Sequence, residues 1–227
     1  MVIIKKALYA LLVIIFSTAT LACKENSIKE DLRHVFKEKS GRYAVYINKK
    51  EFTLNVYNRD GELMDSFKIG YGLNPDQKPK LHAGDERTPE GVYYVTEILS
   101  MDAPKNTPAY RKLKAMNSVF FRAKDGHYRY GNHEADLGDN AYGPRFFRIS
   151  YPNNNDIRRY NEAKKSNRLP VVNGKVPSIG SGIAIHGNCD PQSIGHLSSS
   201  GCIRMYNKDI VELEKYIQIG TPVVIMQ

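Results

Sequence analysis

The segment that decides the fold runs from residue 43 to residue 72 and reads YAVYINKKEFTLNVYNRDGELMDSFKIGYG. Phe52, Leu54 and Val56 alternate with Thr53, Asn55 and Tyr57, which is the period of two expected of a strand with one buried face. Asp60-Gly61 is a dipeptide that closes tight hairpins. The segment therefore predicts strands at Tyr43–Ile47, around Leu54 and at Leu63–Ile69, joined by hairpin turns.

Beyond this segment the patterns of strands continue to the end of the chain. A Gly-, Asn- and charge-rich stretch over residues 100–144 is too long for a bare loop and predicts an inserted flap. The further predicted strands are Val92–Ile98, Phe146–Tyr151, Gly182–His186 and Pro222–Ile225. Together these segments predict a mainly β domain, a two-sheet sandwich-like arrangement with a few peripheral helices.

Two segments have helical signals. Asp156–Asn167 predicts a helix that Asp156 caps and that ends before Pro170. Asn207–Gln218 predicts a second helix, with Asn207 as its cap and an apolar face spaced for burial.

The composition is that of an ordinary globular protein, with 227 residues, 41% hydrophobic and 25% charged. This excludes a collagen-like or disordered chain. The net charge of +9 favours an anionic environment, but the basic residues are scattered and no nucleic-acid motif occurs. No nucleic-acid partner is therefore predicted.

Residues 1–22 have the pattern of a signal peptide, with Lys5 and Lys6 before ten apolar residues and a short small-residue region. Cys23 follows Leu-Ala, which resembles a bacterial lipoprotein signal and would make Cys23 the lipid anchor to a membrane. One alternative is ordinary signal-peptidase cleavage after Ala22, which would leave Cys23 unmodified. The other is that this segment is a buried N-terminal helix and not an export signal. We expect an exported protein of the periplasm or cell envelope, a polar tether over residues 23–40 with one helical turn, and a domain over residues 41–227.

One cluster has the residue types of nucleophilic catalysis. A predicted strand ends at His186, and a Ser/Gly-rich turn contains Cys202. An imidazole can take the proton of a thiol and leave the thiolate, which is the nucleophile. Gly201 lets the backbone N–H groups of the turn point inward, where they can hold an oxyanion. Arg204 adds positive charge for the thiolate or for a substrate carboxylate.

These residues resemble the signature of the bacterial L,D-transpeptidases, the YkuD family. The resemblance is carried by His186-Gly187, a spacer, and then Ser199-Ser200-Gly201-Cys202-Ile203-Arg204-Met205. Thr88–Gly91 resembles the family's Thr-Pro-x-Gly element, and Gly220–Ile225 its closing strand. The sequence departs from the family pattern at Ser200, where a histidine is usual.

The resemblance implies that the substrate is the stem peptide of peptidoglycan. Cys202 would form a thioester with the third residue of a tetrapeptide, with His186 as base and acid and the Gly187 carbonyl as its orienter. Backbone around Gly201 would hold the oxyanion, with Ser199, Ser200 and Arg204 in the same region. The acceptor stays open between a second stem, which gives a 3→3 cross-link, water, which makes a carboxypeptidase, and a protein lysine.

The resemblance implies no metal and no organic cofactor, and a monomer is expected. Other interpretations of the same residues stay open. Cys202 can be an inert buried thiol, and His186 a hydrogen-bonded core histidine. His186, Cys189, His196 and Cys202 have the residue types of a zinc site. A Cys189–Cys202 disulfide would inactivate the site. A wall-binding module with a dead site is the rival of another class, supported by Ser200.

Overall fold

The computed structural model describes residues 28–37, 41–119, 128–136 and 140–227. Residues 28–37 and the residues from Gly41 onward belong to separate units, and each is described by itself. In the first, residues 28–37 form a helix, longer than the single turn expected from the sequence. The predicted signal peptide and Cys23 lie outside the described residues. Within the described ranges, no helix has the length and apolar character needed to cross a membrane.

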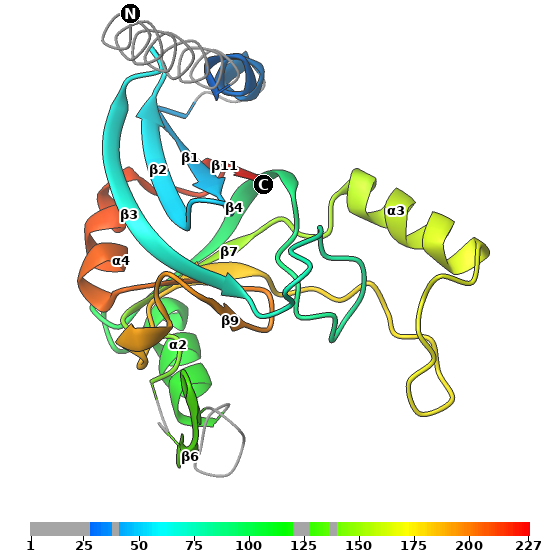
Figure 1. The fold of residues 1–227 in the computed structure, drawn as a ribbon. Coiled ribbons are helices and arrows are strands. Elements are labelled where there is room, and N and C mark those ends of the chain that lie inside the picture. Colours follow the sequence, from blue (N-terminus) through cyan, green and yellow to red (C-terminus); the bar gives the residue numbers. More distant parts are fainter. Residues whose placement is uncertain (1–27, 38–40, 120–127, 137–139) are drawn as a thin grey trace, which may run out of the picture. The chain divides into compact units, whose positions relative to one another are not determined.

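Nine strands form one sheet in the order β10-β8-β7-β4-β11-β1-β2-β3-β9, and β10 also pairs with β3 (Figure 1). A separate hairpin pairs β5 with β6. The strands are β1 Tyr43–Asn48, β2 Thr53–Asn58, β3 Leu63–Gly72, β4 Gly91–Ser100, β5 Tyr128–Arg129, β6 Asn132–Asp136, β7 Arg145–Ile149, β8 Ala184–His186, β9 Leu197–Ser199, β10 Ile203–Met205 and β11 Pro222–Met226.

The opening meander forms where the alternation predicts it. β1 and β2 are antiparallel, as are β2 and β3, and Leu54 and Val56 of β2 are fully buried. β11, the last strand of the chain, lies parallel to β1 and inserts between it and β4. Buried residues of these strands, such as Val45, Leu54 and Val223, belong to one apolar cluster, which also includes Ile210 and Leu213.

The mainly β class predicted from the sequence is confirmed, and the sheet is continuous around the core. The sheet is continuous because of β10, a three-residue strand that was not predicted from the sequence. β10 is parallel to β8, with Arg204 opposite His186, and antiparallel to β3, with Arg204 opposite Gly70. This double pairing joins the two halves of a sandwich into one closed sheet.

The first predicted helix begins two residues earlier than expected. α3 spans Asn154–Lys165, and its N-cap is Asn153, whose side chain accepts hydrogen bonds from the N–H groups of Asn155 and Asp156. Asp156 in turn accepts from the Asn153 N–H at 2.9 Å. The prediction of Asp156 as the cap is wrong, because Asp156 is the third helical residue and closes a capping box.

The second predicted helix is shorter than expected. α4 spans Asn207–Leu213 and continues as a 3-10 turn, η2, over Glu214–Tyr216. The prediction of Asn207 as the cap is also wrong, because Asn207 is the first helical residue. Its Oδ1 accepts instead from the Asn188 N–H at 2.8 Å, which fixes the loop after β8.

The predicted flap is present between β4 and β7. It contains α2, Pro108–Val119, and the β5–β6 hairpin. The Asn117 side chain donates to the Gly143 carbonyl at 3.0 Å and accepts from the Tyr142 N–H at 2.9 Å. Arg145, at the base, pairs with Asp102 and Glu214 at 2.6 and 2.7 Å. These bonds hold the loop that carries Tyr142 in a fixed position.

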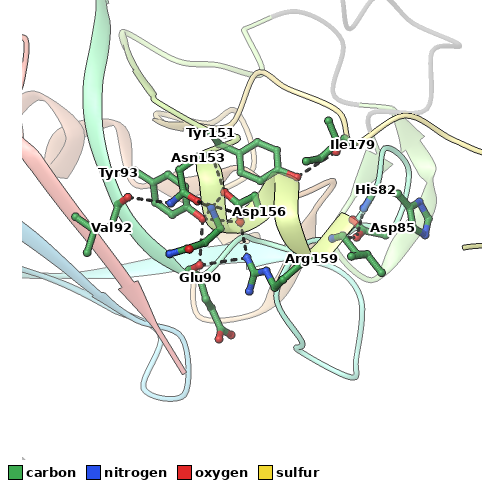
Figure 2. Close-up of polar contacts among 12 residues, drawn as sticks. His82, Asp85, Glu90, Val92, Tyr93, Tyr151, Asn153, Asp156, Arg159 and Ile179 are labelled. Atoms are coloured by element: carbon green, nitrogen blue, oxygen red, sulfur yellow. Dashed lines mark hydrogen bonds and ion pairs between the residues drawn. The ribbon is translucent and has the colours of Figure 1, made fainter. Parts of the chain in front are cut away.

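A polar network anchors α3 to β4 (Figure 2). The Tyr93 hydroxyl donates to the buried Asp156 carboxylate, which also pairs with Arg159. The Tyr151 hydroxyl donates to the Ile179 carbonyl at 3.1 Å, and Tyr160 donates to the Pro177 carbonyl at 2.8 Å. α3 and its neighbours therefore clamp the segment that leads into β8.

Candidate active site

A cavity of about 310 Å³ opens beside the ends of β8 and β10. Its walls come from four parts of the chain that are far apart in sequence. The lining residues are Lys80, Ala83, Gly84, Ala141, Tyr142, Gly180, Ser181, Gly182, Ile183, His186, Ser199, Ser200, Cys202 and Arg204.

His186 is the last residue of β8, and its side chain is buried. Its Nδ1 lies 2.5 Å from the Gly187 carbonyl oxygen. A carbonyl oxygen can only accept, so Nδ1 carries the hydrogen, and Nε2 holds the lone pair of the neutral ring. Tyr142 packs edge-on against the imidazole and Phe146 stacks on it, with centroids 5.0 and 5.9 Å away. The tautomer and the orientation of the ring are thus both fixed.

Gly187 is required for this arrangement. A Cβ at this position would lie 2.5 Å from Asn207 Oδ1 and 2.8 Å from Pro144 Cδ. Its backbone N–H donates to the Arg145 carbonyl at 3.1 Å. The backbone that accepts the His186 hydrogen bond is therefore held from two sides, and a larger residue would displace it.

Cys202 precedes β10 on a turn whose shape depends on Gly201. Gly201 has φ +132°, and a Cβ there would lie 2.7 Å from the Arg87 carbonyl oxygen. The buried Thr88 hydroxyl donates to the Gly201 carbonyl at 2.9 Å and accepts from the Gly72 N–H at 2.9 Å. Thr88 thus joins the cysteine turn to the end of β3.

Ser199 fixes the same turn from inside. Its hydroxyl donates to the Cys202 carbonyl at 2.5 Å and accepts from the Gly201 N–H at 3.1 Å. The Gly201 N–H is therefore engaged within the turn. Ser200, the position where the family usually has histidine, is exposed and lines the cavity.

The environment of Cys202 favours the protonated thiol. Burial raises the pKa of Cys202, although a hydrogen bond from the Ala184 backbone and the charges of Arg204 and Lys80 act in the opposite direction. Sγ lies 3.7 Å from the Gly182 carbonyl oxygen, the acceptor for the S–H group. The thiol therefore requires a base before it can act as a nucleophile.

Two cations line the cavity, and they differ in their pairing. Lys80 is 5% exposed and pairs with Asp85 at 2.7 Å. Burial opposes ionisation of Asp85, but Lys80 and the N–H groups of Leu81 and His82 outweigh it and lower the pKa of Asp85. Arg204 has a buried Nε without a hydrogen-bond partner in the described part of the chain. Burial lowers the pKa of Arg204. The guanidinium is thus the cation of the cavity best placed to receive an anion.

Tyr142 lines the same cavity and lies near the thiol of Cys202. Burial and the proximity of Cys202 raise the pKa of Tyr142 to about 12, so the phenol remains protonated at neutral pH. Its ring contacts His186 and Phe146 and covers the imidazole from one side.

Residues 42–225 match the sequence profile of the YkuD family, which is described as the L,D-transpeptidase catalytic domain. The chain belongs to this family. The YkuD protein of Bacillus subtilis is 54% identical over 41 residues, which are 18% of this chain and 25% of that protein. The YqjB protein of the same organism is 31% identical over 108 residues, or 48% of each chain. The chain thus matches less than half of either relative.

Two solved structures are also similar over part of their length. Bd1075 of Bdellovibrio bacteriovorus is 26% identical with a TM-score of 0.45, covering 82% of this chain and 48% of that one. The helical cell shape determining protein Pgp2 of Campylobacter jejuni is 19% identical with a TM-score of 0.49, covering 89% and 55%.

In this L,D-transpeptidase domain, five of the residues singled out from the sequence line the cavity, namely His186, Ser199, Ser200, Cys202 and Arg204. Gly187 and Gly201 lie beside it and contribute backbone groups and space. Sequence reasoning missed Lys80 and the segment 180–183 as walls, because neither has a local pattern. Tyr142 lies in an aromatic and basic stretch whose composition is compatible with a groove.

The structure also bears on the disulfide and the zinc site that the sequence left open. Neither Cys189 nor Cys202 is in a disulfide. His196 is exposed and stacks on Tyr130 with centroids 4.5 Å apart. Over the described residues, no three His, Cys, Asp or Glu side chains come together as a metal site.

Proposed function

We propose that this protein is a cysteine-dependent L,D-transpeptidase that acts on peptidoglycan tetrapeptide stems through a thioester. The observation that carries the proposal is one cavity lined by the thiol of Cys202 and the imidazole of His186, whose Nδ1 hydrogen is directed to Gly187. The L,D-transpeptidase family acts on peptidoglycan, which supports this substrate class.

Acylation begins with transfer of the Cys202 proton to His186 Nε2. The thiolate attacks the carbonyl carbon of the third residue, and the carbon–nitrogen bond to the terminal D-alanine breaks. The imidazolium gives its proton to the departing amine, so that free D-alanine leaves and a thioester remains. The Gly187 carbonyl stabilises the imidazolium through its bond with Nδ1–H.

The backbone around Gly201 and Cys202 holds the negative oxygen of the tetrahedral intermediate. Because the Gly201 N–H donates to Ser199 Oγ, we assign the main donor to the Cys202 N–H. Arg204 binds a carboxylate of the stem peptide in the cavity, where its buried Nε lacks a partner among the described residues.

Deacylation requires an amine from a second stem. His186 takes a proton from this amine, which attacks the thioester carbon. The carbon–sulfur bond then breaks, a 3→3 amide forms, and the thiolate regains its proton from the imidazolium. Water in place of the amine gives a tripeptide and makes the enzyme a carboxypeptidase.

The test uses residues 24–227, the Cys202→Ala variant, and Cys189→Ala as the matched control. Each is incubated with disaccharide-tetrapeptide, and products are identified by mass spectrometry. A dimer lacking one alanine, formed by the wild type and Cys189→Ala but absent with Cys202→Ala, is the expected result. Tripeptide plus alanine would replace the transpeptidase by the carboxypeptidase. Full turnover by Cys202→Ala would refute the cysteine mechanism.

We further propose that the protein is exported to the periplasm or cell envelope and is anchored there by a lipid on Cys23. The support is the sequence pattern of residues 1–23. Intact mass of the protein from a membrane fraction tests the anchor. The expected mass is that of residues 23–227 plus a diacylglyceryl group, and a mass without this adduct would refute it.

A further inference from the structure

A short hairpin between α3 and β8 projects past the end of α3 (Figure 1). It belongs to the unit over residues 41–227, which contains the cavity and is called the catalytic unit below. Val172 and Lys175 exchange both backbone hydrogen bonds, at 2.9 and 3.1 Å. Asn173 and Gly174 form the turn with φ of 50° and 74°. The base is fixed, because Leu169 is buried and the Pro177 carbonyl accepts from Tyr160. The tip is thus a defined structure on a rigid support.

The tip carries three exposed branched aliphatic side chains. Val171, Val172 and Val176 are 68%, 52% and 43% exposed. Val171 and Val176 lie across the hairpin from each other on one face, and Val172 lies on the opposite face beside Lys175. Both faces of the tip are therefore apolar in part, and neither face is covered by the body of the domain.

The segment of sequence that contains the tip is basic and has no acidic residue. Residues 163–189 contain no Asp or Glu but include Lys164, Lys165, Arg168 and Lys175. All four are exposed. Lys164 and Lys165 end α3, Arg168 precedes the hairpin, and Lys175 belongs to it. An apolar tip in a segment whose exposed charges are all positive matches the boundary of an anionic lipid layer, where alkyl chains lie beneath phosphate groups.

We propose that this hairpin docks the catalytic unit on an anionic phospholipid membrane. The tip is convex, so a rigid protein partner would need a cleft shaped for it, whereas a lipid layer accepts a small apolar projection without a preformed site. The valines enter the boundary of the acyl chains, and the four cations lie over the phosphates. The attachment is reversible, because the inserted apolar area is small.

Docking would set the position of the cavity relative to the membrane. The backbone carbonyl of Ser178, directly after the hairpin, accepts from the Ala83 N–H at 2.7 Å. Ala83 lines the cavity, and so do residues 180–183, which follow Ser178 in the chain. The hairpin is thus rigidly connected to the cavity wall. This inference does not depend on the chemistry of Cys202.

The test measures sedimentation of residues 24–227 with vesicles of phosphatidylcholine alone or with about one third phosphatidylglycerol. This form lacks the predicted leader and Cys23, and its N-terminal residues are the same in every variant. One variant carries Val171→Ser, Val172→Ser and Val176→Ser. A second carries Gln at the four cationic positions. Val211→Ser, at an exposed valine of α4, is the matched control.

The wild type and Val211→Ser should partition onto the anionic vesicles, and the triple serine variant should bind at least tenfold more weakly. Each cation near an anionic surface contributes about fivefold in affinity, so the glutamine variant should lose more than 100-fold. All variants should keep the circular dichroism spectrum and the cysteine-dependent turnover of the wild type, because the changed side chains are exposed. Equal binding by the serine variant, equal binding to neutral vesicles, or sedimentation only with purified peptidoglycan would each overturn the proposal.

Discussion

Thr88 joins the cysteine turn to the end of β3, and its replacement by valine tests whether this link holds the site. Thr88 is 1% exposed, and its hydroxyl accepts from the Gly72 N–H and donates to the Gly201 carbonyl, both at 2.9 Å. Valine has nearly the same shape, so Thr88→Val leaves no cavity. It leaves two buried backbone groups without partners.

The magnitude follows from these two groups. A buried polar group without a partner costs about 1 to 3 kcal/mol, so the free energy of unfolding should fall by at least about 2 kcal/mol. In a domain of this size each kcal/mol lowers the melting temperature by about 2 to 4 °C. The expected decrease for Thr88→Val is therefore at least about 4 °C. Thr88→Ser keeps the hydroxyl and loses one methyl group, which costs about 1 kcal/mol.

The assay combines thermal unfolding by circular dichroism with turnover of the tetrapeptide. Thr88→Val should also lower turnover by more than about tenfold at a temperature where it is folded, because the Gly201 carbonyl loses its anchor. Thr88→Ser should stay within about threefold of the wild type. If Thr88→Val were as stable as Thr88→Ser and equally active, the hydroxyl would not hold the turn, and the reasoning would fail.

Three further predictions concern the charges and the backbone of the site. Arg204→Met should raise the pKa of Cys202 further, because it removes a positive charge that favours the thiolate. Iodoacetamide should then alkylate this thiol more slowly at pH 8, and an unchanged rate would contradict the electrostatic effect of Arg204. The lowered pKa of Asp85 means that its contribution to stability is present at neutral pH and is lost as the pH falls below 3.8 through the folded-state value. Asp85→Asn should therefore lower the free energy of unfolding at pH 7 by about 3 kcal/mol, because it leaves the buried Lys80 unpaired. Urea denaturation measures this difference from the wild type, which should shrink in acid. Gly201→Ala should lower the melting temperature by several degrees, since its methyl group would lie 2.7 Å from a backbone oxygen, and an unchanged melting temperature would argue against the positive φ.

The strands of the opening meander were predictable because their signal is local. The alternation around Leu54 and the Asp60-Gly61 dipeptide act within a few residues, and the structure has β2 and the turn to β3 where these signals occur. The helix caps were not predicted correctly. Asn and Asp are both good caps, and only the contacts of Asn153 and Asn207 decide which residue begins each helix.

The candidate site was predictable in its chemistry and not in its walls. His186 and Cys202 were identified because thiol and imidazole chemistry requires these residue types, and the family signature has them at this spacing. Lys80 and Tyr142 have no such signature. They line the cavity because the loop before β4 and the flap both fold back to β8 and β10.

The sequence by itself determined the mainly β class, the family, and the residues that can act as nucleophile and base. The class follows from periodicity, the candidate nucleophile and base follow from side-chain chemistry, and the family follows from the resemblance of the motif around His186 and Cys202. All of these are carried by single residues and near neighbours. Only the tertiary structure decided that β10 closes the sheet between β8 and β3 and that Thr88 fixes the cysteine turn. It also decided that Arg204 lacks a partner for its Nε in the described chain. The β10–β3 pairing and the Thr88 hydrogen bond join segments more than 100 residues apart, and no local pattern in the sequence encodes a pairing over that distance.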